Sequence, residues 1–235
     1  MSLLKIPCIL FAMIGLQVTT TAPHPPALPE EMLSTSKMEL LVKQRSGPII
    51  VQLICWTAAI GEATVILATN SPALKISQNI LSVLAFDGTE EKIKVSPLFV
   101  LGTFLTALGG FIRYRCYREL GRLFTFEMSL RTEHKLVTTG PYSIVRHPGY
   151  LGVVLCVFGI MIWHAGSGSW ARECGPLKTT LGQGIAMIYL ILVTTITFGL
   201  LIRMYKEDEA LSEAFSEEWA DWVERVPHRL IPGLY

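Results

Sequence analysis

Residues 184–202 read GIAMIYLILVTTITFGLLI and contain no charged side chain. A helix of about 20 mostly apolar residues crosses the hydrocarbon core of a bilayer, so this stretch predicts a membrane-spanning helix. Four similar apolar blocks precede it, at residues 3–20, 48–69, 96–112 and 150–165. The sequence therefore predicts an all-α, multi-pass integral membrane helical bundle with about five transmembrane helices.

The composition of the chain supports a membrane protein and argues against several other classes. The 235 residues are 51% hydrophobic and 17% charged, whereas soluble domains carry about 25% charged residues. A net charge of +1 gives no electrostatic reason to expect a nucleic-acid partner. The five cysteines are scattered without a Cys-x-x-Cys pair, which argues against a disulfide framework and a zinc site. We expect the lipid bilayer as a partner and no bound metal.

Two of the blocks carry residues that bear on helix packing. Glu62 lies within the second block, and we expect a buried, neutral or hydrogen-bonded carboxyl that faces other helices rather than a catalytic group. The third block has small residues at a spacing that suits close contact between helices, namely Gly102, Thr103, Thr106, Gly109 and Gly110.

The distribution of positive charge predicts the orientation of the bundle. If all five blocks span, residues 21–47, 113–149 and 203–235 share one side and carry 14 Lys and Arg, against 6 on the other side. The positive-inside rule places the richer side, with the C-terminus, in the cytosol and the N-terminus outside the cell or in the lumen. The first block also has features of a secretory signal peptide. Its removal would invert every later segment, so we expect it to be retained.

A dense polar segment lies just before the fourth block. It reads HKLVTTGPY over residues 134–142 and continues to RHPGY at residues 146–150. Gly140-Pro141 predicts a turn, and Pro148 favours an extended His147 with a helix beginning after it. Irregular backbone at the membrane surface is tolerated where it lines a cavity, so we expect a ligand site here. The alternative is that Arg146 snorkels, Tyr150 anchors the span, and both histidines are merely interfacial or solvated.

The charged tail after the fifth block predicts a second part of the same site. Arg203 and Glu207 are four residues apart and share one face of a helix; a solvated surface ion pair is the alternative. The stripe Leu211, Phe215, Trp219 and Trp222 predicts a cytosolic amphipathic helix lying on the membrane or on the other spans. Only two spans separate the polar segment from the tail, so both fall on the same side of the membrane.

These two segments resemble the isoprenylcysteine carboxyl methyltransferase family, whose members methylate the C-terminal carboxylate of prenylated proteins. One matching part is His134-x-Leu136-Val137-Thr138-x-Gly140-x-Tyr142-x3-Arg146-His147-Pro148-x-Tyr150-x-Gly152. The other is Arg203-x3-Glu207, followed by Phe215-x-Glu217-Glu218-Trp219-x2-Trp222-x2-Arg225-Val226-Pro227. The resemblance implies a methyltransferase region over 113–235 after an N-terminal transmembrane region over 1–112.

The resemblance also implies the ligands, the location and the site. It implies S-adenosyl-L-methionine as cofactor, prenylated CaaX-processed proteins as partners, and an endoplasmic reticulum membrane with the active site facing the cytosol. Arg203 and Glu207 are the implied catalytic residues, with Arg203 contacting the substrate carboxylate. Family members often have Gln where this chain has Glu127. The implied cofactor-binding residues are His134, Lys135, Leu136, Val137, Tyr142, His147, Pro148, Gly149, Tyr150 and Glu207.

Other activities stay open at this point. A looser form of the first motif occurs in phospholipid methyltransferases and in some membrane sterol reductases. A phospholipid N-methyltransferase is therefore one alternative, and a sterol-type reductase that uses NADPH is another. A non-catalytic membrane scaffold is the third, although the intact motif residues argue against it.

Overall fold

The computed structural model describes residues 2–25, 46–85, 88–126 and 135–234, and these form helices and connecting turns without a strand. The five longer helices are α1 (Lys5–Thr20), α3 (Ser46–Thr69), α5 (Pro97–Leu120), α6 (Pro148–Ala165) and α8 (Thr180–Arg225). The shorter ones are α4 (Lys75–Leu84), α7 (Trp170–Glu173) and 3-10 turns at Ser2–Leu4, Glu90–Lys92, Gly121–Leu123, Gly140–Ser143 and Pro176–Lys178. The predicted all-α fold is confirmed.

Each predicted apolar block corresponds to one of the longer helices. By length and composition, α3, α8 and the helical stretches 97–123 and 148–173 are long enough to cross a membrane. The fifth, α1, is apolar but has only 16 residues. The described chain thus has four helices of spanning length and one shorter helix, close to the five spans that the sequence predicts.

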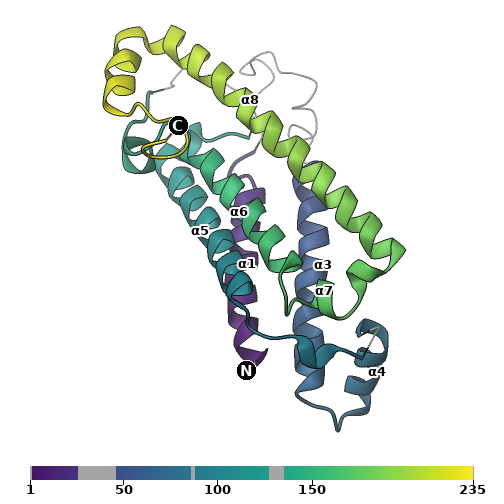
Figure 1. Cartoon of the computed structure of the whole chain (residues 1–235). Coiled ribbons are helices and arrows are strands. Elements are labelled where there is room, and N and C mark those ends of the chain that lie inside the picture. The colour runs from purple at the N-terminus through teal and green to yellow at the C-terminus, as the bar shows by residue number, and fades with distance from the viewer. Residues whose placement is uncertain (1, 26–45, 86–87, 127–134, 235) are drawn as a thin grey trace.

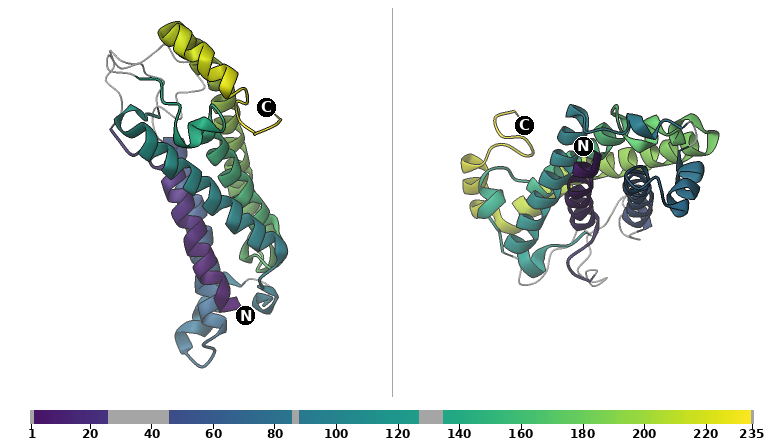
Figure 2. Two further views of the ribbon diagram at one scale, coloured as in Figure 1. Left: turned by 90° about the vertical axis from the view of Figure 1, so that its left-hand side faces the viewer. Right: turned by 90° about the horizontal axis from the view of Figure 1, so that it is seen from below.

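The helices alternate in direction (Figure 1). α1, α5 and α8 run from the end where the N-terminus lies toward the opposite end, and α3 and α6 run back. The segment before α6 and the end of α8 therefore meet at the same end of the bundle, as Figure 2 also shows. The shared side that the span count predicts for these segments is observed; which side faces the cytosol stays a prediction.

Two helices extend beyond the predicted apolar blocks. α5 begins at Pro97, after the Ser96 side chain accepts a hydrogen bond from the Phe99 amide at 3.2 Å. It continues past residue 112 and ends at Gly121, where φ is +52°. α8 likewise continues past residue 202 and carries an interruption at Ser216, where φ is +33°. Charged residues end the apolar block without ending the helix, because Arg, Lys and Glu are themselves good helix formers.

Glycines on α1, α5 and α6 bring these helices into backbone contact. A side-chain carbon added at Gly102 would lie 2.6 Å from the carbonyl of Gly159, and one at Gly109 would collide with the backbone of α6 at Gly152. On another face of α5, Gly110 meets Gly15 of α1. This confirms the close packing predicted from the small residues of the third block.

A buried ion pair joins α1 to α3 at the end of the bundle near the N-terminus. Lys5 and Glu62 are fully buried and form a salt bridge. The Trp163 indole donates to Glu62 Oε2 at 3.2 Å, and Lys5 Nζ donates to the Gly168 carbonyl at 2.7 Å. The expected buried and hydrogen-bonded Glu62 is confirmed. Its lysine partner, 57 residues earlier, was not predicted.

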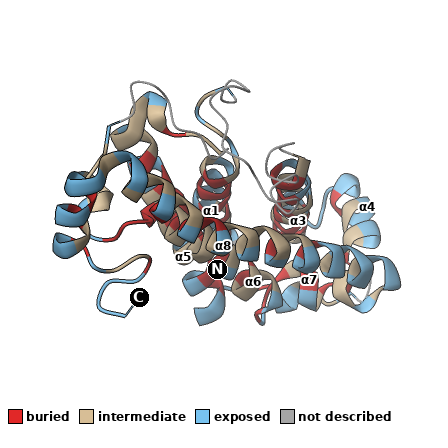
Figure 3. Ribbon diagram, turned by 90° about the horizontal axis from the view of Figure 1, so that it is seen from above, coloured by how far each residue is buried: buried red, intermediate tan, exposed pale blue. Residues whose placement is uncertain are grey.

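α8 is the least buried of the spanning helices. Only 11% of its most apolar 18-residue stretch is buried, whereas the corresponding share is 39% for each of the other three spanning helices. Figure 3 shows α8 mostly in intermediate and exposed colours. Exposed apolar side chains along α8 suit contact with lipid, and the helix forms one wall of the bundle rather than part of its core.

We expect Gly109→Ala to destabilise the bundle, because the added methyl group meets the α6 backbone and overpacking costs about 1–3 kcal/mol. The matched control is Gly199→Ala on α8, where an added carbon has nothing within 4 Å. Thermal unfolding in detergent, followed by tryptophan fluorescence, should show a lower Tm for the first variant only. Equal midpoints for the two variants would contradict this packing.

Candidate functional site

A cavity of about 230 Å³ lies where the polar segment meets the end of α8. Side chains from α1, α3, α5, α6 and α8 line it, together with residues 123–126 and 135–137. Pro148 is the first residue of α6 and lies beside the lining, while His134 and Glu127 fall outside the described residues. The sequence-predicted residues that do line it are Lys135, Leu136, Val137, Tyr142, His147, Gly149, Tyr150, Arg203 and Glu207.

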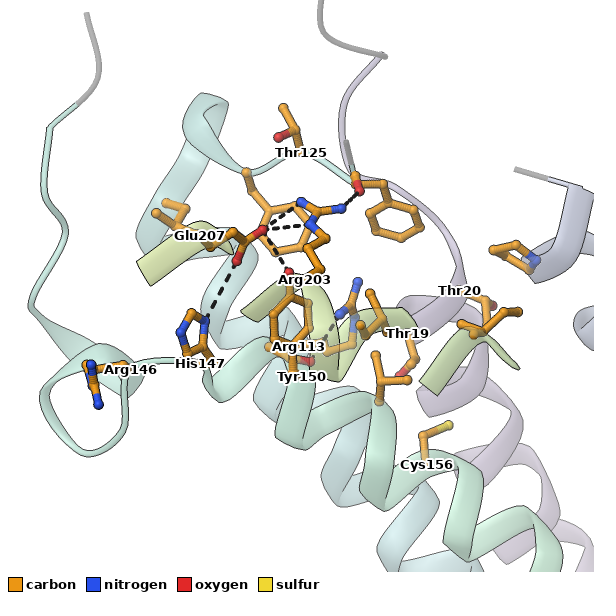
Figure 4. Close-up of a pocket in the computed structure, with 18 of the residues that line it drawn as sticks. Thr19, Thr20, Arg113, Thr125, Arg146, His147, Tyr150, Cys156, Arg203 and Glu207 are labelled. Carbon is orange, nitrogen blue, oxygen red and sulfur yellow. Dashed lines mark hydrogen bonds and ion pairs between the residues drawn. The ribbon is translucent and has the colours of Figure 1, made fainter. Parts of the chain in front are cut away.

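Glu207 is the centre of the polar side of this cavity (Figure 4). Its Oε1 accepts hydrogen bonds from the Tyr150 hydroxyl at 2.7 Å and from Arg203 Nε at 2.8 Å, and it lies 2.7 Å from Arg203 Nη2. Its Oε2 lies 3.7 Å from His147 Nδ1, beyond hydrogen-bond distance. One oxygen is therefore held by the protein and the other is left to accept a hydrogen bond from a ligand.

Arg203 is buried and joins two parts of the chain. Besides Glu207, it donates through Nη1 to the carbonyl of Phe126 in the chain that follows α5. Arg203 therefore joins α8 to that chain and also fixes the orientation of Glu207. The i,i+4 ion pair considered at the sequence level is present, and it lies inside a cavity rather than in a solvated surface run.

Asp208, the next residue, faces a different set of partners. His147 Nε2 lies 2.7 Å from its Oδ1, while Arg146 Nη1 and Arg229 Nε lie 3.1 and 2.9 Å from its Oδ2. Figure 4 shows Arg146 turned away from the Glu207 cluster. His147 thus lies between the two adjacent carboxylates and is hydrogen-bonded to Asp208, which also ties α8 to the C-terminal segment. The sequence analysis did not predict this role of Asp208.

The C-terminal segment fixes the polar segment through its backbone. The amides of Arg146 and His147 donate to the carbonyls of His228 and Arg229 at 3.0 and 2.8 Å. Arg146 also donates to the Pro227 carbonyl at 3.1 Å. The snorkelling role considered for Arg146 is therefore wrong, because its guanidinium is buried in these contacts.

The predicted aromatic stripe packs on the polar segment. Trp219, Trp222 and Val226 form a cluster against Leu136 and Tyr142. The Trp222 indole donates to the Tyr142 carbonyl at 3.1 Å. Burial raises the pKa of the Tyr142 phenol well above its ordinary value, and the nearby Cys116 thiol adds to the effect. The hydroxyl therefore stays protonated. The stripe thus serves as a cover for this side of the cavity.

Arg113 is a site residue that sequence reasoning counted only as a positive charge. It is buried, donates from Nη1 to the Gly149 carbonyl at 3.1 Å, and donates from Nε to the Tyr117 hydroxyl at 2.9 Å. The spacing of Gly102, Thr106, Gly109 and Arg113 continues one helical face, which was the signal available in the sequence.

The cavity has two chemically different halves. The polar half lies around Glu207, and the other half is lined by apolar side chains from the membrane-spanning parts of α6 and α8. Among the described residues, no group of three or more His, Cys, Asp or Glu gathers as metal ligands would. The apolar half is lined by Val153, Val157, Ile160, Val193, Ile196 and Leu200.

Comparison with known proteins relates this architecture to membrane methyltransferases. The phospholipid methyltransferase family matches residues 97–172. Protein-S-isoprenylcysteine O-methyltransferase B of Arabidopsis thaliana is 26% identical over 156 residues, which cover 66% of this chain and 68% of the plant protein. A probable protein-S-isoprenylcysteine O-methyltransferase of Oryza sativa subsp. japonica is 29% identical over 136 residues, or 57% of this chain and 61% of that protein.

The likeness to sterol reductases is more restricted. Delta(14)-sterol reductase TM7SF2 of Mus musculus is 25% identical over 104 residues, which cover 44% of this chain and 21% of the reductase. The resemblance to isoprenylcysteine methyltransferases is confirmed and extends over a larger share of both chains. Together these similarities support methyltransferase activity at a membrane.

We expect Asp208→Asn to destabilise the closed site, because it leaves the buried Arg146 and the adjacent Arg229 without their carboxylate. Removing one partner of a buried ion pair costs about 3–5 kcal/mol. Glu209→Gln is the matched control, since Glu209 is the next residue and is exposed. Denaturant titration in detergent should separate the two variants, and equal stabilities would show that Asp208 is not structural.

Proposed function

We propose that this protein transfers a methyl group from S-adenosylmethionine to the C-terminal carboxylate of a prenylated cysteine in CaaX-processed proteins. The observation that carries the proposal is one continuous cavity with a charged half around Glu207 and an apolar half between α6 and α8. The charge of the first half suits a cationic nucleoside, and the apolar lining of the second suits a prenyl chain. Likeness to proteins named isoprenylcysteine O-methyltransferases supports the same substrate class.

The residues of the charged half fit such a cofactor. Glu207 presents Oε2 to the cavity, and a carboxylate oxygen suits the amino group or the positive charge of S-adenosylmethionine. The His147 and Tyr150 rings stack at 5.5 Å and form a flat wall. We assign cofactor binding to these residues together with Lys135, Leu136, Val137, Tyr142, Pro148 and Gly149, and to His134 from the sequence resemblance.

The reaction requires the protein to align the two reactants and to exclude water, and it does not require a general base. S-adenosylmethionine supplies a methyl group on a positively charged sulfur, so a carboxylate oxygen bonds to that carbon while the C–S electron pair stays on sulfur. A free carboxyl group has a pKa near 3.5 and is already ionised at neutral pH, so no residue has to remove a proton. Holding the reactants in line contributes about 7–11 kcal/mol toward lowering the barrier.

Arg203 and Glu207 prepare the charged half for this reaction. Three contacts from Tyr150 and Arg203 fix Glu207, so its Oε2 has a defined direction. Arg203 adds a positive charge that favours an acceptor carboxylate nearby. Because opposite charges disappear during the transfer, water would stabilise the reactants, and a site that excludes water favours reaction.

The membrane arrangement follows from the same assignment. The apolar half of the cavity lies within the spanning parts of α6 and α8, where a prenyl chain can remain among apolar side chains. The excess of Lys and Arg at the site end supports a cytosolic location for that end. We propose the endoplasmic reticulum as the membrane, as the family resemblance implies.

We expect membranes that contain the protein to transfer radiolabelled methyl groups from S-adenosylmethionine to N-acetyl-S-farnesylcysteine. Because the family match also names phospholipid methyltransferases, phosphatidylethanolamine is offered in parallel. A sterol substrate with NADPH tests the reductase alternative. Label in phosphatidylethanolamine without label in farnesylcysteine would overturn the proposal, and so would reduction of the sterol without any methyl transfer.

We expect Glu207→Gln to weaken cofactor binding, because a hydrogen bond to a charged group contributes about 1.5–3 kcal/mol. The dissociation constant for S-adenosylhomocysteine or S-adenosylmethionine should rise about 10- to 100-fold by calorimetry. Glu213→Gln, an exposed position on the same helix, should bind like the wild type. An unchanged affinity in Glu207→Gln would remove this residue from the cofactor site.

A further inference from the structure

Arg113 is a buried cation without an acidic partner among the described residues. Three arginines are buried in the described chain: Arg146 pairs with Asp208, Arg203 pairs with Glu207, and Arg113 pairs with neither. Arg113 is 5% exposed, and its hydrogen-bond partners are a carbonyl and a phenol. A buried charge with only neutral partners is unfavourable, and an anionic ligand would relieve that cost.

The surroundings of Arg113 leave part of its guanidinium open to the cavity. Nε and Nη1 are held by Tyr117 and Gly149, which leaves Nη2 as the remaining donor group. The rings of Phe124 and Phe126 lie 5.5 and 5.2 Å from the guanidinium carbon and limit its movement. Figure 4 shows the group between Tyr150 and Thr19, at the cavity. The fixed plane suits recognition of a carboxylate.

Arg113 also occupies the position along the cavity that a prenylcysteine carboxylate requires. Figure 4 places it between the Arg203–Glu207 pair on the charged side and Cys156 on the α6 side. In a prenylcysteine, only the short cysteine unit separates the apolar chain from the carboxylate. The carboxylate must therefore bind where the charged and apolar halves meet, which is the level of Arg113.

Arg203 is less suited to direct contact. Its Nε and Nη2 both reach Glu207 Oε1, and its Nη1 reaches the Phe126 carbonyl, so each nitrogen already has a protein acceptor. We infer that Arg113 is the residue that binds the acceptor carboxylate, and that Arg203 acts by positioning Glu207. This inference rests on the proposed function and names the contact that selects an acid as its substrate.

The experiment compares binding of N-acetyl-S-farnesylcysteine with that of its carboxamide, measured by calorimetry on the full chain without cofactor. The wild type should prefer the acid, and Arg113→Gln should lower its affinity for the acid about 10- to 100-fold while leaving the amide unchanged. Arg113→Lys keeps the positive charge and should retain part of the preference. Arg115→Gln, an exposed arginine on the same helix, should behave as wild type.

Binding of S-adenosylhomocysteine is measured for each variant as a check on folding. It also tests the alternative that Arg113 binds the carboxylate of the cofactor instead of that of the substrate. Unchanged cofactor affinity in Arg113→Gln with loss of the acid preference supports the inference. A retained acid preference overturns it, as does a loss of cofactor affinity with the acid preference intact. If the wild type neither methylates farnesylcysteine nor prefers the acid, the proposed function itself fails. This result differs from failure of the Arg113 inference, in which the wild type prefers the acid and Arg113→Gln keeps that preference.

Discussion

The two adjacent carboxylates near the end of α8 are the constraint on which the site depends. Glu207 faces the cavity and holds Tyr150 and Arg203, while Asp208 holds Arg146, His147 and Arg229. Lipid is as apolar as a leucine side chain, so burial of apolar surface gives helices little reason to associate within a membrane. α8 buries little of its apolar surface, and polar contacts at the membrane boundary therefore fix its position. Without them, the residues on α8 and α6 would not share one site.

The remaining helices are held together by different means, and this difference creates the cavity. α1, α5 and α6 meet through glycines at backbone distance, which leaves no space between them. α1 and α3 are joined by the buried Lys5–Glu62 pair at the far end. α8 packs loosely against α3 and α6, so space lined by Val157, Val193 and other apolar side chains remains beside it. This contrast between closely packed helices and the loosely packed α8 suits the long apolar chain of the proposed substrate.

Much of this arrangement could be predicted because it depends on local sequence or on the number of spans. The apolar blocks predicted the longer helices, and Pro148 predicted the start of α6. The four-residue spacing predicted that Arg203 and Glu207 share one face of a helix. The number of intervening spans placed the polar segment and the tail on the same side. The Lys5–Glu62 and Arg146–Asp208 pairs could not be predicted, because each joins residues at least 57 positions apart. Arg113 was overlooked because a charge that ends an apolar block usually lies at the interface.

The charges of the site suggest how one turnover leads to the next. Asp208 pairs with Arg146 and Arg229, and Glu207 pairs with Arg203. With Arg113 as the acceptor site, an incoming carboxylate completes the set of ion pairs. Methylation converts that carboxylate into an uncharged ester, which can no longer pair with Arg113. Under the proposed function, this contact would bind the acid more strongly than the ester, which favours release of the product.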